Sequence, residues 1–351
     1  LYDIQGARAF NQGEVSDPAH VGVRALDDVT LQVHLEAPTS YFLHLLTYVT
    51  TFAVPRHVVE THGEAWTDLS NIVTSGPFTL TAWERGEFLV LERNPAYHGR
   101  FTGNLERVEC SVMAERSVTV LQLYEDNSLD TFFFEHLPVA EWGQARQRYA
   151  GEYVSGPELA TYYIGLDADQ PPFDDPRVRQ AFILATARET LAHVTLKGYV
   201  FPATGGLVPP GMPGHSPTIG LPYDPEAARQ LLAEAGYPGG RGFPTVESLA
   251  PERYLIGPAL KALEAQWLEN LGVEITWKEI EWDRFVNRMW RRPPHMWFLR
   301  WMADYPDPDS FLRASIWRVF SPWQDEAYDQ LVEGARRLTD QKERMKMYEQ
   351  A

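Results

Sequence analysis

Aromatic side chains gather near the carboxyl end of the chain, in a pattern that favours ligand binding. Trp, Tyr and Phe together make up 13% of the residues. Flat aromatic side chains line pockets for apolar or sugar surfaces, and they lose little conformational entropy on binding. Ordinary core packing is the alternative interpretation of the same residues. The segment contains Trp277, Trp282, Phe285, Trp290, Trp297, Phe298, Trp301 and Tyr305.

The residue patterns of common catalytic and metal sites are absent from the sequence. There is no Gly-x-Ser-x-Gly elbow, no phosphate loop and no His-Glu-x-x-His helix. The nearest histidines, His57 and His62, have the wrong spacing to share one helical face. The single cysteine, Cys110, excludes an internal disulfide and a thiolate metal cluster. We therefore expect a binding protein and not an enzyme, with no metal ion and no cofactor.

The charge balance narrows the possible partners. The chain has 31 Lys and Arg against 48 Asp and Glu, a net charge of −17. Nucleic acid is not an expected partner, because phosphate binding needs a positive surface. No apolar run is long enough to span a bilayer. Leu1 opens directly into a polar stretch, so any signal segment is expected to lie outside this chain.

Helix and strand signals alternate along the elements that must position the aromatic segment. Asp174-Asp175-Pro176 and Asp224-Pro225 each combine a carboxylate cap with a proline in the first helical turn. Alternating apolar residues predict strands over 273–277 and 296–301. In the first half, alternation over 21–35 predicts a hairpin with one buried face. The alternation of helices and strands predicts α/β architecture.

Several segments resemble the oligopeptide/dipeptide-binding family of ABC-importer substrate-binding proteins, which is solute-binding protein family 5. They occur in the family's order and span nearly the whole chain, so together they are far more specific than any one alone. The segments are GVRALDD (22–28), PRHVVE (55–60), IVTSGPF (72–78), LERNPAY (91–97), PFDDPRVRQA (172–181), LLAEAGY (231–237) and WMADYPDP (301–308).

This resemblance implies an α/β, periplasmic-binding-protein-like fold, with two lobes joined by a hinge and a small extra subdomain. Residues 1–57 are expected to end the small subdomain, 58–160 to form part of lobe one, and 161–351 most of lobe two. Members of the family run longer at both ends. The resemblance therefore implies that the start of lobe one and the last strands lie outside this chain.

The resemblance also implies a function and a site. In peptide-binding relatives the aspartate of the Trp-x-Ala-Asp segment holds the peptide's α-ammonium, and the matching residue is Asp304. Trp301 and Met302 are expected to offer backbone groups to an extended ligand. Capping of the turn before Pro306 is the alternative role for Asp304. The expected ligand-binding residues are Asp304, Trp301, Met302, Arg300, Tyr305, Tyr162, Tyr163, Trp282 and Met289.

The expected biology follows from this family. We expect an extracytoplasmic monomer that captures a short peptide by lobe closure and passes it to an ABC-importer permease. It would meet the membrane only through that permease or through a lipid anchor outside this chain. An oligosaccharide ligand, another small solute and a ligand-sensing module of a transcriptional regulator remain alternatives. A hydrolase is a further alternative.

One departure from the family pattern concerns the residues that would bind the carboxylate of a peptide ligand. Phe298 and Met289 stand where some relatives have arginines that receive a peptide carboxylate. Arg300 and Arg288 are the candidate substitutes. The sequence therefore does not fix the length of the ligand, nor whether the ligand is a peptide.

Overall fold

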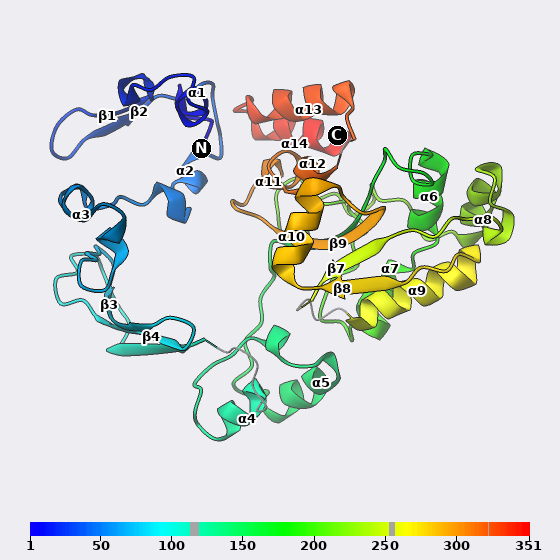
Figure 1. Ribbon diagram of the computed structural model, residues 1–351, viewed down its shortest axis with the longest axis horizontal. Coiled ribbons are helices and arrows are strands. Elements are labelled where there is room, and N and C mark those ends of the chain that lie inside the picture. Colours follow the sequence, from blue (N-terminus) through cyan, green and yellow to red (C-terminus); the bar gives the residue numbers. More distant parts are fainter. Residues whose placement is uncertain (113–118, 253–256, 322) are drawn as a thin grey trace. The chain divides into compact units, whose positions relative to one another are not determined.

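The computed structural model describes residues 1–112, 119–252, 257–321 and 323–351, which form two compact units (Figure 1). Unit 1 comprises Leu1–Tyr48 and Pro138–Ala351, and unit 2 is Val49–Leu137. The chain therefore leaves unit 1 directly after Tyr48 and returns at Pro138. The three-part division expected from the sequence stays a prediction.

A mixed four-stranded sheet forms the centre of unit 1, in the strand order β6-β9-β7-β8. Strand β6 (Ala160–Leu166) runs antiparallel to β9 (Met296–Met302). Strand β7 (Ser248–Pro251) runs parallel to both β9 and β8 (Trp277–Ile280). Residues of β7 are all buried, which agrees with a position inside the sheet.

The strand expected over 273–277 lies further along the chain than predicted, because β8 runs from Trp277 to Ile280 and shares only Trp277 with the expected range. Val273 and Ile275 are still fully buried, since their side chains pack into the core from a non-strand segment. Apolar alternation reported their burial correctly but could not tell an extended loop from a paired strand.

Helices on one face of the sheet enclose the largest core of unit 1. These are α6 (Pro176–Leu184), α8 (Pro225–Glu234) and α9 (Gly257–Leu271). The predicted caps are confirmed: Asp175 accepts from the Arg177 N–H, and Asp224 accepts from two N–H groups of its helix.

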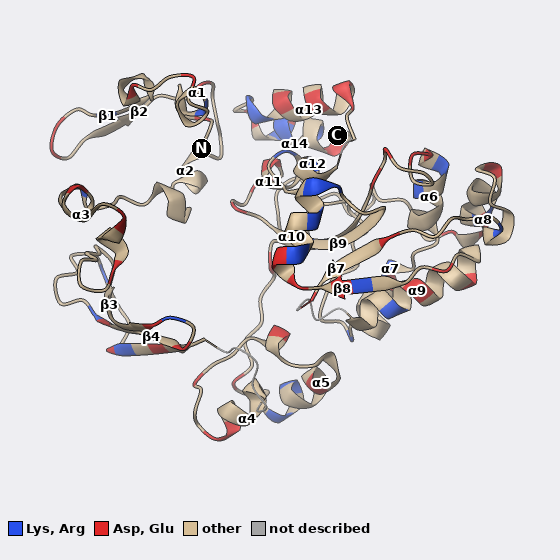
Figure 2. Ribbon diagram, viewed as in Figure 1, with Lys and Arg blue, Asp and Glu red and all other residues tan. Residues whose placement is uncertain are grey.

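The other face of the sheet is covered by α10 (Trp282–Arg291), an amphipathic helix. Its residues Phe285 and Met289 pack against Trp297 and Leu299 of β9. Figure 2 shows basic residues along α10 and acidic residues at its start. Met296 and Phe298 face the other core, so the side chains alternate as they should in the strand predicted over 296–301.

The predicted hairpin is present as β1 (Val23–Ala25) and β2 (Leu31–Val33), which pair antiparallel. The expectation of a buried face is wrong for these strands. Val23 is 40% exposed and Leu31 is 66% exposed. No core cluster in the described part of the chain includes either strand, so their apolar side chains are left in solvent.

The C-terminal helices form a second layer of unit 1 around their own core. They are α11 (Asp309–Leu312), α12 (Trp317–Phe320), α13 (Glu326–Arg336) and α14 (Gln341–Gln350). The remaining elements of unit 1 are α1 (Ala7–Asn11), η1 (Pro18–His20), α2 (Phe42–Leu45), α5 (Val139–Arg148), α7 (Arg188–Thr190), η5 (Leu191–Thr195) and η6 (Pro238–Gly240).

Unit 2 contains an antiparallel three-stranded sheet in the order β3-β4-β5. Its strands are β3 (Phe78–Glu84), β4 (Phe88–Arg93) and β5 (Arg107–Ser111). Its helices are η2 (Val49–Thr51), α3 (Arg56–His62), η3 (Gly63–Thr67), α4 (Val120–Glu125) and η4 (Phe134–His136). Across the described ranges of both units, no helix has the length and apolar character that a membrane crossing requires.

Candidate ligand-binding site

The expected ligand-binding segment begins on strand β9 and continues past its end. Tyr162 of β6 stands opposite Arg300 of β9. The ladder extends one residue further, because the Ala303 N–H donates to the Leu159 carbonyl at 2.8 Å. Asp304 follows immediately, so a rigid strand pair holds the start of this segment.

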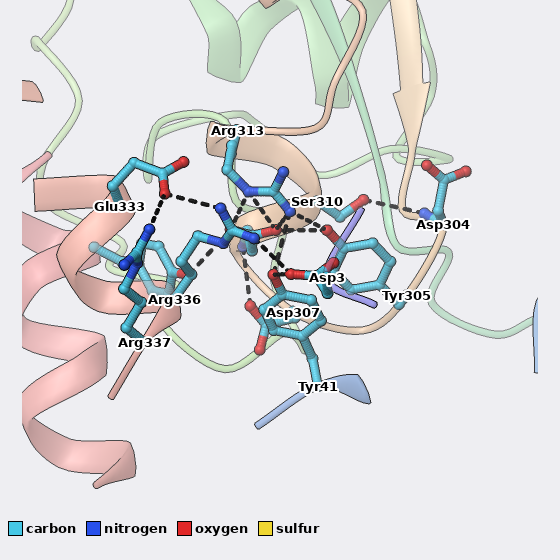
Figure 3. Close-up of polar contacts among 12 residues, drawn as sticks. Asp3, Tyr41, Asp304, Tyr305, Asp307, Ser310, Arg313, Glu333, Arg336 and Arg337 are labelled. Carbon is cyan, nitrogen blue, oxygen red and sulfur yellow. Dashed lines mark hydrogen bonds and ion pairs between the residues drawn. The ribbon is translucent and has the colours of Figure 1, made fainter. Parts of the chain in front are cut away.

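Asp304 lies partly buried and is held at its main chain. Its N–H donates to the Oγ of Ser310 at 3.1 Å, and its carboxylate points away from the polar residues around Ser310 (Figure 3). Burial raises the pKa of the Asp304 carboxyl, and a hydrogen bond from the Tyr48 hydroxyl opposes part of that rise. The carboxylate forms no ion pair with any described residue. Such a group is suited to receive a cation from a ligand.

The neighbours of Asp304 divide between exposed and buried positions. Trp301 is partly buried, and its indole N–H donates to the same Ser310 Oγ at 3.4 Å. Met302 is 56% exposed, so a ligand can reach it. Tyr305 is only 5% exposed and stacks on Tyr41 with ring centroids 4.9 Å apart. Its side chain therefore belongs to the packing beneath the site.

Arg300 and Tyr162 form a charged and aromatic pair beside this segment. The Arg300 guanidinium lies over the Tyr162 ring, 5.6 Å from its centroid, and forms an ion pair with Glu158. Tyr162 also stacks on Phe298, with centroids 5.8 Å apart. The strand pair thus brings together Tyr162, Arg300, Met302 and, just beyond the strand, Asp304.

The other expected residues lie on the opposite face of the sheet. Tyr163 packs against the core that contains Met289 of α10, and Met289 is 2% exposed. Trp282 is 43% exposed and stacks on the buried Phe285. In this structure Met289 is a core residue, and the strand pair does not bring it or Trp282 next to Asp304.

A buried polar cluster lies beside Asp304, on the side away from its carboxylate (Figure 3), and no sequence pattern predicted it. It joins the first residues of the chain to the C-terminal helices. Its members are Asp3, Tyr41, Tyr305, Asp307, Asp309, Arg313, Arg336, Arg344 and Tyr348.

Each acid of this buried polar cluster has an arginine partner. Asp309 is fully buried and binds Arg313, with N–O distances of 2.8 and 3.0 Å among their contacts. Asp307 accepts two hydrogen bonds of 2.6 Å from Arg344. Burial disfavours the charged form of Arg313, but the hydrogen bond and charge of Asp309 outweigh it, and the net pKa is raised. These acids are therefore already paired, unlike Asp304.

The arrangement offers no geometry for a metal centre. Among residues 1–112, 119–252, 257–321 and 323–351, no three His, Cys, Asp or Glu side chains are grouped to hold an ion. Arg288, the other candidate for an anionic group, pairs with Glu247 at 2.6 Å on the α10 side of the sheet.

The family model described as "Bacterial extracellular solute-binding proteins, family 5 Middle" matches residues 3–316. This chain belongs to the family 5 solute-binding proteins. The resemblance seen in the sequence motifs is thereby confirmed, and the family is one of binding proteins.

Two curated relatives of this family 5 protein come from Escherichia coli. It is 31% identical over 360 residues to the "Probable deoxycholate-binding periplasmic protein YgiS", with 99% of this chain and 65% of the relative covered. It is 30% identical over 340 residues to the "Periplasmic oligopeptide-binding protein OppA", with 94% and 62% covered. The chain thus spans less than two thirds of the length of these relatives.

Solved structures of similar proteins confirm the α/β, periplasmic-binding-protein-like fold. The oligopeptide-binding protein OppAIV of Borrelia burgdorferi superposes with a TM-score of 0.84 at 28% identity, over 99% of this chain and 69% of that one. The murein tripeptide binding protein MppA of Escherichia coli gives a TM-score of 0.84 at 24% identity, over 100% and 69%. The second likeness concerns the fold alone.

Proposed function

We propose that this family 5 protein is the ligand-capturing part of an extracytoplasmic receptor for short peptides that have a free amino terminus. The observation that carries this proposal is the partly buried Asp304 carboxylate, which has no cationic partner among the described residues. A relative named for oligopeptide binding, OppA, supports the class of ligand.

The chemistry of Asp304 fits an ammonium ligand. Removing a carboxylate from water disfavours its charged form, which is why its pKa is raised. An ammonium group placed beside it restores a favourable charge interaction and supplies three donors. Losing one partner of such a buried charge pair costs about 2–5 kcal/mol. The free amino terminus would therefore carry a large part of the binding energy.

The receptor would act without breaking a bond in its ligand. A ligand that contacts both lobes in the closed form binds that form more tightly than the open form. It therefore shifts the equilibrium towards the closed form by the difference between the two binding free energies. A membrane permease of an ABC importer would then recognise the closed form. In this proposal the protein is a monomer outside the cytoplasm that uses no cofactor and no nucleic acid. Its only contact with the membrane is through the permease or a lipid anchor.

Calorimetric titration tests the amine contact. A short peptide should bind, its N-acetylated form should bind at least tenfold more weakly, and Asp304→Asn should abolish that difference. Asp283→Asn, which removes an exposed acid of α10, is the control and should leave the affinity unchanged. Equal binding of free and acetylated peptides would show that Asp304 is not an amine clamp.

A bile salt is the second candidate ligand, because the YgiS relative is named for deoxycholate and matches 99% of this chain. Deoxycholate carries a carboxylate and no ammonium, so its binding should not depend on Asp304. Binding of deoxycholate without any binding of peptides, and unchanged in Asp304→Asn, would favour this candidate over the first. Quenching of tryptophan fluorescence by oligosaccharides alone would favour the sugar alternative.

A further inference from the structure

Trp290 is a large aromatic residue that the proposed peptide site does not use. It is 64% exposed near the end of α10, and its ring packs edge-on against the buried Phe320 of α12, with centroids 5.4 Å apart. A tryptophan in this position leaves a large apolar area in water. The exposed part of the ring is therefore free to contact an apolar ligand.

Trp290 forms one wall of a groove of about 420 Å³. Small-molecule sites commonly measure roughly 300–1,000 Å³. Three segments of unit 1 meet in the groove: the residues that follow β6, the end of α10 and the end of α12. Its apolar lining includes Phe320 and the exposed Val319. The groove thus has the size and the apolar walls of a ligand site.

Two neighbouring arginines line the same groove without an acidic partner. Arg291 is the last residue of α10 and Arg292 is its C-cap, and neither forms an ion pair with any described residue. The Arg292 guanidinium donates to the Oε1 of Gln170 at 3.1 Å, which is a neutral acceptor. Arg288 of the same helix differs, because Glu247 already pairs with it. Arginines in a last helical turn suit the helix dipole, but that interaction leaves their five donors free to bind a carboxylate.

Two acids also line the groove, and they differ in how their charge is stabilised. Asp167 is buried, and its carboxylate accepts from the Asp169 N–H at 3.1 Å and from the side-chain amide of Gln170. These donors stabilise the charge of Asp167. Asp169 forms no ion pair with any described residue. Its carboxylate opposes an anion in the groove, so neutralising Asp169 should strengthen the binding of an anion.

The groove lies at the opposite end of β9 from Asp304. The Asp167 N–H, one residue past β6, donates to the carbonyl of His295, one residue before β9. Asp304 lies two residues beyond the other end of β9. The seven residues of this strand, at about 3.3 Å each, separate the two places by about 20 Å. The groove is therefore distinct from the proposed peptide site.

We propose that this groove is a second binding site, which takes a small anionic amphiphile. The carboxylate of such a molecule pairs with Arg291 and Arg292, while its apolar body covers Trp290 and Val319. Burial of the apolar body favours binding, and the two arginines select for the negative charge. This inference goes beyond the proposed function and does not depend on it.

Calorimetric titration of the whole chain with deoxycholate, below the concentration at which it forms micelles, tests this site. The probe has a rigid apolar skeleton and one carboxylate, and its neutral amide is the comparison. The acid should bind about tenfold more tightly than the amide, because only the acid makes a charge-assisted contact. The double variant Arg291→Gln, Arg292→Gln should remove this preference. Asp169→Asn should strengthen binding of the acid several-fold and leave binding of the amide unchanged.

Trp290→Ala should weaken binding of both the acid and the amide at least tenfold, because both lose the same apolar wall. The double arginine variant changes exposed side chains only, so it tests the site even if Trp290→Ala fails to fold. Equal binding of acid and amide to the unchanged protein would overturn the inference.

An exposed tryptophan of unit 2 with an arginine beside it supplies the control. Trp83 is 42% exposed, and the Arg85 guanidinium lies 5.0 Å from the centroid of its ring. Trp83→Ala and Arg85→Gln should leave the binding of deoxycholate unchanged. A loss of affinity as large as that in Trp290→Ala would overturn the inference, since the binding would not be specific to the groove.

Two further measurements separate the groove from the proposed peptide site. Saturation with deoxycholate should leave the affinity for a peptide unchanged, and Asp304→Asn should leave the affinity for deoxycholate unchanged. If deoxycholate displaces the peptide and Trp290→Ala does not affect its binding, the amphiphile binds in the peptide site and the inference is wrong. If deoxycholate does not bind at all, the inference is again wrong, while the proposed amine contact of Asp304 is unaffected.

Discussion

The main-chain N–H of Asp304 is bonded to the hydroxyl of Ser310, 3.1 Å away and fully buried. The same hydroxyl accepts from the indole N–H of Trp301. Ser310 belongs to α11, whose first residue, Asp309, is bound by Arg313. The hydroxyl of Ser310 therefore connects Asp304, the proposed ammonium site, to α11 and so to the buried polar cluster.

Ser310→Ala should weaken binding of a peptide amine several-fold, because Asp304 and Trp301 lose their common acceptor. Leaving donors unsatisfied should also lower the free energy of unfolding by about 1–3 kcal/mol. Ser315→Ala is the matched control. Ser315 is equally buried and donates to the Phe311 carbonyl at 2.7 Å, without contacting Asp304. If both variants bind equally well after correction for folding, the hydroxyl of Ser310 does not position the acid.

Asp304→Asn should stabilise the unliganded protein near neutral pH. The pKa of Asp304 in the folded protein is raised above 3.8, so the folded state binds this proton more tightly than the unfolded state does. The contribution of Asp304 to stability is therefore most favourable at low pH and is lost as the pH rises through the raised pKa. Thermal melting should show a gain of about 1–2 °C at pH 7. The gain should shrink at low pH, where Asp304 is protonated, and a loss of stability at pH 7 would contradict the prediction.

The affinity for a peptide amine should fall as the pH is lowered, and the fall should begin above the range of an ordinary aspartate. Protonation of Asp304 removes the charge that attracts the ammonium, and its pKa is raised by burial. Tyr48→Phe should move the midpoint of this fall to higher pH, because the Tyr48 hydrogen bond lowers the pKa of Asp304. Titrations at a series of pH values measure both midpoints. If Tyr48→Phe left the pH midpoint of the affinity unchanged, the hydroxyl of Tyr48 would not interact with Asp304.

Asp309→Ala should be among the most destabilising single changes in unit 1. It leaves the Arg313 charge and the Tyr305 hydroxyl without their main partner in a buried position. Breaking one side of a buried ion pair lowers the free energy of unfolding by about 3–5 kcal/mol. Glu60→Gln, which breaks the exposed Arg56–Glu60 pair of 2.7 Å, should change it by about 0.5 kcal/mol or less. Urea denaturation compares the two variants, and similar losses would show that the polar cluster is not an important source of stability.

Local signals in the sequence predicted the framework of unit 1. The caps Asp175 and Asp224 were readable because each bonds to N–H groups within three residues of itself. The faces of β9 were readable because side chains alternate on a strand. The hairpin of β1 and β2 was predicted, but the exposure of its apolar residues was not, because their burial depends on what packs against them.

The contacts around Asp304 could not be predicted either, because they join residues that lie far apart in the sequence. Tyr41 and Tyr305 stack although 264 positions separate them in the sequence, since 305 − 41 = 264. Tyr48 reaches Asp304 across a similar separation. Such pairs have no periodic signal, because only the folded chain brings them within reach.

The sequence by itself determined the family, through motifs in a fixed order, and the match to the Trp-x-Ala-Asp motif pointed to Asp304 in the segment WMADYPDPD (301–309). By residue type alone, Asp304, Asp307 and Asp309 are equivalent candidates. The structure separated them: Arg344, 37 positions further along the chain, pairs with Asp307, and Arg313, one helical turn away, pairs with Asp309. Asp304 is left partly buried with a hydrogen bond and no cation, and a charge in that state is stabilised by binding a positive group.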